Sequence, residues 1–339
     1  MLTDILLSSA ATRVIVCAIG SICLSVGILW ILLRTGLAWS LATDVPNERS
    51  LHTRPTPRIG GWGIMPVVCV LVWFLSPALR PVVAAAAALA LLSQIDDRRG
   101  LPARVRFAGH VVAVAAFLLA YPVGLPWWAV VTIGFLMVWL VNLYNFMDGS
   151  DGLAGGMALF GFGGYALISL FGVHPSVELA ICAAAVAGAA AGFLVFNFHP
   201  ARIFLGDAGS ISLGFLAGAL GFCGWRSGIW PIWLPAQLFA PFIADASITL
   251  LKRLMRGEKF WQAHREHYYQ RMVRLGAGHA RTACCWYAVM GAGIIAAMWA
   301  VRLSALQQWL VVASWYGVLA AMGLVIDSRW RQFQTTVSK

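Results

Sequence analysis

Five short polar stretches interrupt an otherwise apolar chain, and the densest of them runs from Asn142 to Asp151. It holds two amide side chains and two carboxylates within ten residues. Asn142, Asn145 and, less closely, Asp148 follow the helical i, i+3, i+6 spacing, which predicts one polar helix face at a membrane surface. Polar groups beside hydrocarbon are costly unless they are partnered, so a functional site is the first interpretation. The alternative is a capped turn, with Asp148 or Asp151 as the N-cap of the next helix.

A second polar stretch, residues 94–106, begins with adjacent carboxylates. Asp96 and Asp97 follow an apolar run and precede several arginines, among them Arg104. Neighbouring like charges raise the pKa of one member of a pair, so a proton acceptor or a Mg²⁺ partner is one interpretation. A helix end solvated among arginines is the alternative.

A third stretch, residues 196–210, sets one carboxylate, Asp207, between glycines at an expected helix start. Backbone N–H groups at a helix start can face an anion. The same stretch holds Asn197. The residues before Asp207 are Phe-Leu-Gly and not Gly-x-Gly, so an intramembrane aspartyl protease site is excluded.

Two more loops are rich in basic residues. Residues 44–61 contain three prolines and paired glycines, which predict an irregular loop; its arginines could face phosphate, but for this loop alone an anchoring role is favoured. The last loop, residues 252–282, contains His264, His267 and Arg271 at i, i+3 and i+7, which predicts that they line one helical face. Zinc binding is an alternative, but no cysteine is nearby, so a basic surface facing phosphate is favoured.

Composition defines the elements that must position these residues. The chain has 339 residues, of which 60% are hydrophobic and 11% charged, as in a polytopic membrane protein. We expect an all-α helical bundle with about eleven transmembrane helices, forming a single domain over residues 1–339. The apolar segments are 14–33, 61–79, 81–95, 107–122, 126–144, 153–172, 177–196, 210–225, 231–251, 283–301 and 306–326.

The basic residues predict the orientation. With the N-terminus outside and the C-terminus inside, all but four of the 24 Lys and Arg residues fall on the cytoplasmic side. The acidic residues of the polar stretches fall on the same side, which predicts an active site at the cytoplasmic face. The net charge of +11 is then largely a topology signal, and no nucleic-acid partner is expected.

The five stretches together resemble a known family. Asp-x-Pro-Asn-x-Arg…His…Pro-Thr-Pro-Arg-x-Gly-Gly, Asp-Asp, Asn-x-x-Asn-x-x-Asp-Gly-x-Asp-Gly, Phe-Leu-Gly-Asp-x-Gly-Ser and a His-rich loop follow in this order over residues 44–271. The pattern resembles the polyprenyl-phosphate N-acetylhexosamine-1-phosphate transferases, most closely the O-antigen-initiating branch. Such enzymes transfer a sugar 1-phosphate from a UDP-sugar to undecaprenyl phosphate in the bacterial cytoplasmic membrane, and release UMP.

The resemblance implies roles for particular residues. The implied catalytic residues are Asp96, Asp97 and Asp207, and the implied ligands of Mg²⁺, or of Mn²⁺ in its place, are Asp207 and Asn145. The implied substrate-binding residues are Asn145, Asp148, Asp151, Asn197, Arg104, His264, His267 and Arg271. Arg104 stands where relatives usually have Lys, which keeps the charge but changes the geometry.

The expected function is therefore the first membrane step of O-antigen or another surface polysaccharide, as in lipopolysaccharide biosynthesis. Direct displacement is preferred to a phospho-enzyme. The alternative is a membrane transporter of ions or lipid-linked substrates that uses the inner-face Asp residues, and a scaffold with a degenerate site is a third interpretation. The identity of the N-acetylhexosamine and the presence of a homodimer are left open.

Overall fold

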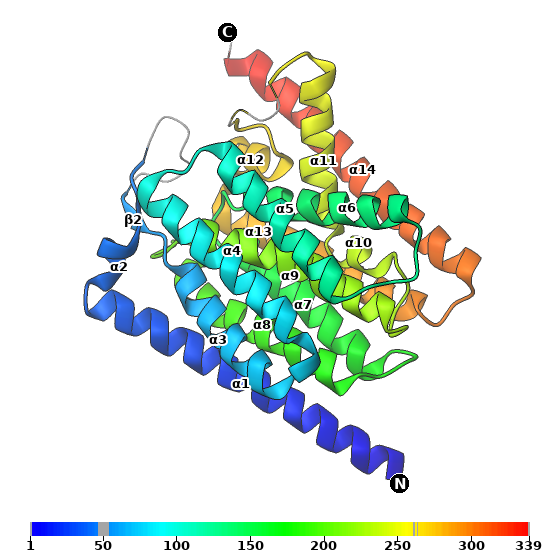
Figure 1. The fold of residues 1–339 in the computed structure, drawn as a ribbon. Coiled ribbons are helices and arrows are strands. Elements are labelled where there is room, and N and C mark those ends of the chain that lie inside the picture. The colour runs from blue at the N-terminus through cyan, green and yellow to red at the C-terminus, as the bar shows by residue number, and fades with distance from the viewer. Residues whose placement is uncertain (1, 47–53, 260–261, 263, 338–339) are drawn as a thin grey trace.

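The computed structural model describes residues 2–46, 54–259, 262 and 264–337. The described chain is a bundle of helices with one short two-stranded ladder, and its two ends lie on opposite sides of the bundle (Figure 1). The elements before the second polar stretch are α1 (Leu2–Arg34), α2 (Leu37–Leu41), β1 (Thr43–Asp44), β2 (Thr56–Pro57), α3 (Gly60–Leu75) and η1 (Pro77–Leu79). The central helices are α4 (Arg80–Arg99), α5 (Ala103–Ala120), α6 (Trp127–Phe146), α7 (Leu153–Phe171), α8 (Val177–Asn197) and α9 (Asp207–Arg226). The last elements are α10 (Leu234–Leu238), α11 (Ala240–Met255), α12 (Tyr268–Met272), η2 (Val273–Ala277), α13 (Gly278–Ala300) and α14 (Ala305–Val337).

The expected all-α membrane fold is confirmed. Within the described residues, nine helical stretches are long and apolar enough to cross a membrane: Ser9–Arg34, Pro77–Arg99, Ala103–Ala120, Trp127–Phe146, Leu153–Phe171, Val177–Asn197, Asp207–Arg226, Tyr268–Ala300 and Ala305–Thr336. Each of the eleven predicted segments has a helical counterpart, but two of them do not meet this criterion as single helices. The total of eleven crossings and their direction stay predictions.

The expected span over residues 231–251 is wrong as a single helix. The structure breaks it at Phe239, between α10 and α11, where the backbone has φ −99° and ψ 12°. Pro241 lies in the first turn of α11 and Pro235 in the first turn of α10. Proline lacks an N–H and clashes with the preceding turn of a helix, so it starts a helix more readily than it continues one.

The segment expected over residues 81–95 is longer in the structure. The helix α4 continues through Asp96 and Asp97 to Arg99 and is 20 residues long. The helix that falls short is α3, with 16 residues, or about 24 Å at 1.5 Å per residue. Polar residues of the second stretch thus belong to the last turn of α4.

The centre of the bundle is packed through glycine. A Cβ on Gly214 of α9 would lie 2.9 Å from the Cα of Val141 on α6, and a Cβ on Gly192 of α8 would lie 2.8 Å from the Ile22 carbonyl oxygen on α1. Such approaches need a residue without a side chain. Gly214 and Gly192 are therefore helix-packing residues.

The loop over residues 44–61 is held against the start of α9. β1 pairs with β2 in antiparallel register, Asp44 opposite Thr56. The N–H groups of Gly60 and Gly61 donate to the carbonyls of Phe204 and Leu205, each at 2.9 Å. This junction fixes Asp44 beside the N-terminus of α9. Glu48, Arg49 and His52 of the same loop lie outside the described residues.

Candidate active site

A polar pocket of about 210 Å³ lies where the ends of several helices meet. It is bounded by the β1–α3 region, the end of α6, the loop before α7, the end of α8 and the starts of α9 and α13. Its lining residues are Asp44, Arg58, Asn145, Asp148, Gly149, Ser150, Asp151, Asn197, Phe204, Gly206, Asp207 and His279. Five of the predicted site residues are therefore brought to one cavity: Asn145, Asp148, Asp151, Asn197 and Asp207.

Glycines shape the loop that carries Asp148 and Asp151. A Cβ on Gly149 would lie 2.2 Å from the hydroxyl oxygen of Tyr269, so a larger residue would displace Tyr269. Gly152, at φ +75°, is the N-cap of α7, and no side chain caps that helix. The alternative of a capped turn is wrong, because neither carboxylate accepts from the first turn of α7. Both carboxylates therefore bind groups other than the start of α7, or remain available to a ligand.

Asn145 and Asp207 meet at the centre of the site. The Nδ2 atom of Asn145 donates to Asp207 Oδ1 and to Ser210 Oγ, each at 2.9 Å. Asp207 is the first residue of α9 and follows Gly206, which has φ +74°. The residues expected to share a metal ion are therefore direct neighbours.

Two arginines contact the carboxylates of α4, and one of them, Arg106, also lies close to Asp207. Arg106 Nη1 lies 2.9 Å from Asp96 Oδ2 and 3.8 Å from Asp207 Oδ2. Arg58 Nη2 lies 2.7 Å from Asp44 Oδ1, and its Nη1 lies 3.4 Å from Asp97 Oδ1. The sequence interpretation did not single out Arg58 as a site residue, because in an arginine-rich loop an anchoring role looked the simpler explanation.

The side chain of Asp97 is 2% exposed, and its second oxygen has an unusual environment. Among the described residues no hydrogen-bond donor reaches the buried Oδ2 atom. The absence of a Cβ on Gly206 leaves room beside it, since a Cβ there would lie 3.4 Å from Oδ2. A buried carboxylate oxygen without a donor attracts a proton or a cation.

Arg104 is not brought to the site. It is exposed and does not line the pocket, whereas Arg106 lies two residues further along α5 and contacts Asp96 and Asp207. Successive helical residues are about 100° apart, so positions 104 and 106 point to nearly opposite sides of the helix. Of these two arginines, Arg106 and not Arg104 faces the carboxylates.

Asp148 has a distinctive protonation equilibrium. Burial and then the negative charge of Asp207 raise the pKa of the Asp148 carboxyl to about 8. A carboxyl with this pKa is largely protonated at neutral pH and releases its proton when a cation approaches. The protonation state of Asp148 therefore depends on the charges present in the pocket.

At another part of the pocket, Asp151 is surrounded by histidines and backbone groups. Its Oδ2 lies 2.7 Å from His199 Nδ1 and accepts from the Ala201 N–H at 3.1 Å. Asn197 accepts from the Gly152 N–H and donates to the Ile203 carbonyl, and so joins the end of α8 to the loop before α7 and to the loop before α9. His279, at the start of α13, lines the same wall. The sequence interpretation missed it because the tenth span was placed from residue 283.

The last loop does not have the predicted geometry. His264 and His267 precede α12, which begins at Tyr268, so the expectation that they and Arg271 line one helical face is wrong. The reason is Asp245 of α11, a fully buried carboxylate that accepts from the backbone N–H groups of Tyr268 and Tyr269 at 2.9 Å and 3.0 Å. It fixes the start of α12 at that position.

None of these three residues lines the polar pocket. His267 Nδ1 lies 3.2 Å from Asp245 Oδ1, and Arg271 Nη1 lies 2.6 Å from Asp327 Oδ1 on α14. Burial and then the positive charge of His267 lower the pKa of His264 to about 4. The loop touches the site through Tyr269, whose hydroxyl donates to the Phe146 carbonyl at 3.3 Å.

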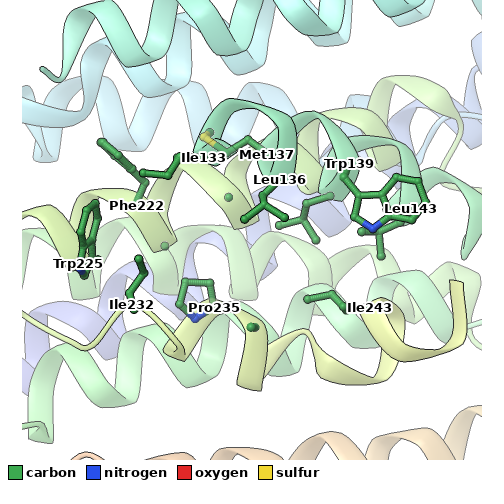
Figure 2. A pocket seen from close by; sticks show the side chains of 14 residues that line it. Ile133, Leu136, Met137, Trp139, Leu143, Phe222, Trp225, Ile232, Pro235 and Ile243 are labelled. Carbon is green, nitrogen blue, oxygen red and sulfur yellow. The ribbon is translucent and has the colours of Figure 1, made fainter. Parts of the chain in front are cut away.

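A second, apolar pocket of about 250 Å³ lies on the flank of α6. Figure 2 shows side chains of α6, α9, the segment before α10, α10 itself and α11 around it, with Met137 and Leu143 on α6 and Phe222 on α9. Leu143 is two residues before Asn145 on the same helix. The apolar and polar pockets are therefore bounded by the same segment of chain.

Fold and site together define a multi-pass membrane protein with an acidic and arginine-containing pocket of the kind that handles phosphate esters. Comparison with known proteins agrees with this class. A model of the glycosyl transferase family 4 matches residues 79–224. Over 309 residues the chain is 31% identical to the decaprenyl-phosphate N-acetylglucosaminephosphotransferase of Mycolicibacterium smegmatis, covering 75% of this chain and 74% of that protein.

Two further relatives support the same assignment. Over 300 residues the chain is 26% identical to the probable undecaprenyl-phosphate N-acetylglucosaminyl 1-phosphate transferase of Bacillus subtilis, covering 79% of each chain. Over 104 residues it is 43% identical to the phospho-N-acetylmuramoyl-pentapeptide-transferase of Oceanobacillus iheyensis, covering 31% of each chain. The chain belongs to the polyprenyl-phosphate N-acetylhexosamine-1-phosphate transferases.

Proposed function

We propose that the protein transfers an N-acetylhexosamine 1-phosphate from a UDP-sugar to undecaprenyl phosphate. The observation that carries the proposal is the cluster beside the polar pocket in which Asp207 contacts Asn145 and Arg106, and Arg106 also contacts Asp96 of α4. A phosphate of the lipid and the diphosphate of the nucleotide need such a mixture of cationic and metal-binding groups. The printed names of the relatives make UDP-GlcNAc the first sugar donor to test.

In the proposed reaction an oxygen of the lipid phosphate attacks the β-phosphorus of the UDP-sugar. A new P–O bond forms, the bond from that phosphorus to the bridging oxygen breaks, and UMP leaves with the electron pair. A phosphate monoester has a second pKa near about 6, so the attacking oxygen is largely deprotonated at neutral pH. Asp97, held by Arg58, therefore serves mainly to orient the lipid phosphate.

A Mg²⁺ ion, or Mn²⁺ in its place, fits the residues present. Among the described residues no group of three or more His, Cys, Asp or Glu could hold a metal ion alone. Mg²⁺ commonly binds through one or two carboxylates together with substrate phosphates, and Asp207 and the unpartnered Asp97 Oδ2 offer such oxygens. Asn145 offers its Oδ1 only if its amide turns over, because Nδ2 faces Asp207. When bound, the ion would neutralise charge on the diphosphate and the leaving UMP.

The apolar pocket on α6 is proposed to hold the proximal part of the prenyl chain. It is lined by apolar side chains, and α6 connects it to Asn145. The phosphate end of that chain is proposed to reach the polar pocket at the end of α6. Membrane lipid would occupy the same surface in the resting enzyme.

The proposed setting is the bacterial cytoplasmic membrane, with the N-terminus outside, the C-terminus inside and the site facing the cytosol. There the nucleotide sugar arrives from water and the prenyl chain from lipid. The product would start O-antigen or a related surface polysaccharide. A homodimer is compatible with this function but is not required by the site.

The transporter and scaffold interpretations have less support. A transport site is expected near the membrane midplane. Here the carboxylates gather at the helix ends, and the buried Asp245 is committed to the start of α12.

The decisive experiment measures UMP release by detergent-purified protein supplied with undecaprenyl phosphate and Mg²⁺. Donors are UDP-GlcNAc, UDP-GalNAc, UDP-FucNAc and UDP-QuiNAc. We expect lipid-dependent release that falls by at least about 100-fold in Asp207→Asn and in Asp97→Asn, whereas Glu178→Gln, at the opposite end of α8 from Asn197, retains it. Folded protein that releases no UMP with any donor would overturn the proposal.

A further inference from the structure

A third pocket, apolar and of about 250 Å³, lies between α3 and α4, which pack side by side (Figure 1). Gly61, Ala87 and Ala90 line it, and their small or absent side chains leave space between the two helices. Leu91, another lining residue, is 64% exposed, so the pocket opens on the outer surface of the bundle. We propose that this pocket binds an acyl chain of an anionic phospholipid, whose phosphate lies against Arg98.

The polar end of this pocket is formed by Gln94. Its Oε1 accepts from Trp62 Nε1 at 2.6 Å, and its Nε2 donates to the Leu41 carbonyl at 3.3 Å. Arg98 Nε donates to the same carbonyl at 3.1 Å. Because Gln94 lines the pocket and shares an acceptor with Arg98, the guanidinium lies directly beside the end of the pocket.

The guanidinium is available to a ligand. Residues 87, 91, 94 and 98 follow the i, i+4, i+7, i+11 spacing, so they form one stripe of α4 from the apolar pocket to the last helical turn. Arg98 is exposed, and beyond its Nε contact no partner is found for it in residues 2–46, 54–259, 262 and 264–337. Its remaining N–H groups can donate to a phosphate in the paired geometry that arginine favours.

The neighbouring helix α2 has the side chains of a membrane–water boundary. Leu37 and Trp39 are each 53% exposed. Tryptophan is enriched where lipid headgroups meet the hydrocarbon, because its ring is apolar and its N–H is polar. Since the Leu41 carbonyl at the end of α2 accepts from Arg98, this arginine is expected at the depth of the headgroups.

The charges around Arg98 favour an anionic headgroup over a zwitterionic one. The nearest carboxylates on α4, Asp96 and Asp97, are buried and paired with Arg106 and Arg58. Neither offers a surface partner to the ammonium group of a zwitterionic headgroup, whereas the phosphate of an anionic lipid needs only the arginine.

The same surroundings separate this lipid from the proposed acceptor substrate. Arg98 does not line the polar pocket, and the pocket proposed for the prenyl chain lies on α6. A phosphate bound to Arg98 is therefore outside the proposed reaction site. The lipid would instead hold the last turn of α4 against α2, next to Asp96 and Asp97.

Photo-crosslinking in detergent tests the location. Delipidated protein is irradiated with phosphatidylglycerol that carries a diazirine in one acyl chain, and the crosslinked peptides are located by mass spectrometry. We expect crosslinks within residues 61–69 and 87–94. Unlabelled dioleoylphosphatidylglycerol should suppress them at about fivefold lower concentration than dioleoylphosphatidylcholine, which is the effect of one arginine on an anionic lipid.

Two matched pairs of variants separate the headgroup from the chain. Arg98→Gln should remove the difference between the two competitors, whereas Arg99→Gln, about 100° further round the helix, should keep it. Ala90→Leu fills the pocket and should abolish the crosslinks within residues 61–69. Ala88→Leu is its control, because Ala88 is exposed on α4 and is not a lining residue.

Equal suppression by both competitors in wild type, or an unchanged preference in folded Arg98→Gln, would mean that the pocket holds only the surrounding lipid and would overturn the inference. Stronger suppression by undecaprenyl phosphate than by dioleoylphosphatidylglycerol would assign the pocket to a prenyl chain and overturn it equally. If Ala90→Leu fails to fold, the arginine pair still decides. The measurement needs no UDP-sugar and no turnover, so its outcome is independent of the proposed reaction.

Discussion

Asn145 and Asp207 lie 62 residues apart in sequence, and the amide of Asn145 donates to the Asp207 carboxylate at 2.9 Å. The contact joins the end of α6 to the start of α9. Asn145 is the last residue but one of α6, and Asp207 is the first residue of α9. This hydrogen bond thus connects the end of α6 and the start of α9 within one site.

The first prediction concerns this pair. Asp207→Asn removes a negative charge from the proposed metal site, and we expect kcat to fall by about 100- to 1,000-fold, the size of effect seen when one group that stabilises transition-state charge is lost. Asn145→Ala should instead raise the Mg²⁺ concentration needed for half-maximal rate. Titration of UMP release with Mg²⁺ distinguishes the two effects. An Asp207→Asn enzyme with wild-type kcat would contradict the metal assignment.

The second prediction uses two arginines on one helix as a matched pair. Arg106 contacts Asp96 and Asp207, whereas Arg104 is exposed. We expect Arg106→Ala to lower kcat/KM for the UDP-sugar by about 10- to 100-fold, because a charge-assisted hydrogen bond is lost. Arg104→Ala should change it by less than about twofold. The reverse order of effects would restore Arg104 as the substrate-binding arginine of α5.

The third prediction concerns pH. Burial and the charge of Asp207 raise the pKa of Asp148 to about 8, whereas an aspartate in the unfolded chain has a pKa near about 3.9. Between these pH values the folded state binds a proton that the unfolded state lacks, so the free energy of unfolding falls as pH rises. The contribution of this group reaches at most about 1.4 kcal/mol per pH unit.

Thermal unfolding in detergent with EDTA, from pH 6 to pH 8.5, measures this effect. The Tm of wild type should decrease more steeply with pH than that of Asp148→Asn, which cannot ionise at this position. Parallel curves for the two proteins would show that Asp148 is already ionised at pH 6. Adding Mg²⁺ and UMP should flatten the wild-type curve, because a cation near the carboxylate favours its ionised form.

The fourth prediction tests the apolar pocket of Figure 2. Gly218 lines it, so Gly218→Leu places a side chain in the space proposed for the prenyl chain. We expect KM for undecaprenyl phosphate to rise by about tenfold, and KM for the UDP-sugar to stay unchanged. Gly163→Leu is the control, because a Cβ on Gly163 of α7 has no neighbour within 4 Å. Equal effects of both variants on KM for the lipid would argue against this location.

Several features were determined by the sequence alone. Long apolar segments can satisfy their backbone in lipid only as helices, so composition predicted an all-α membrane bundle. Polar residues at the ends of such segments predicted a functional site, because a polar group beside hydrocarbon needs a partner. The family resemblance implied that Asn145, Asp148, Asp151, Asn197 and Asp207 belong to it. These five residues do line one pocket, and the family assignment agrees with the comparisons.

Other features depended on the tertiary structure. Whether Arg104 or Arg106 faces the carboxylates depends on the rotation of α5 about its axis relative to its neighbours. The positions of the charges in the sequence do not predict this rotation. The helical spacing of His264, His267 and Arg271 was misleading, because the buried Asp245 binds the N–H groups of Tyr268 and Tyr269 and starts α12 after the histidines.

The same limit explains the residues that were missed. Arg58 and His279 enter the site through contacts with Asp97 and Ser150, which lie 39 and 129 residues away in the chain. Local sequence patterns predict only which helix contains a residue. Which helix ends meet, and which side chains then share one pocket, is decided by packing between distant segments.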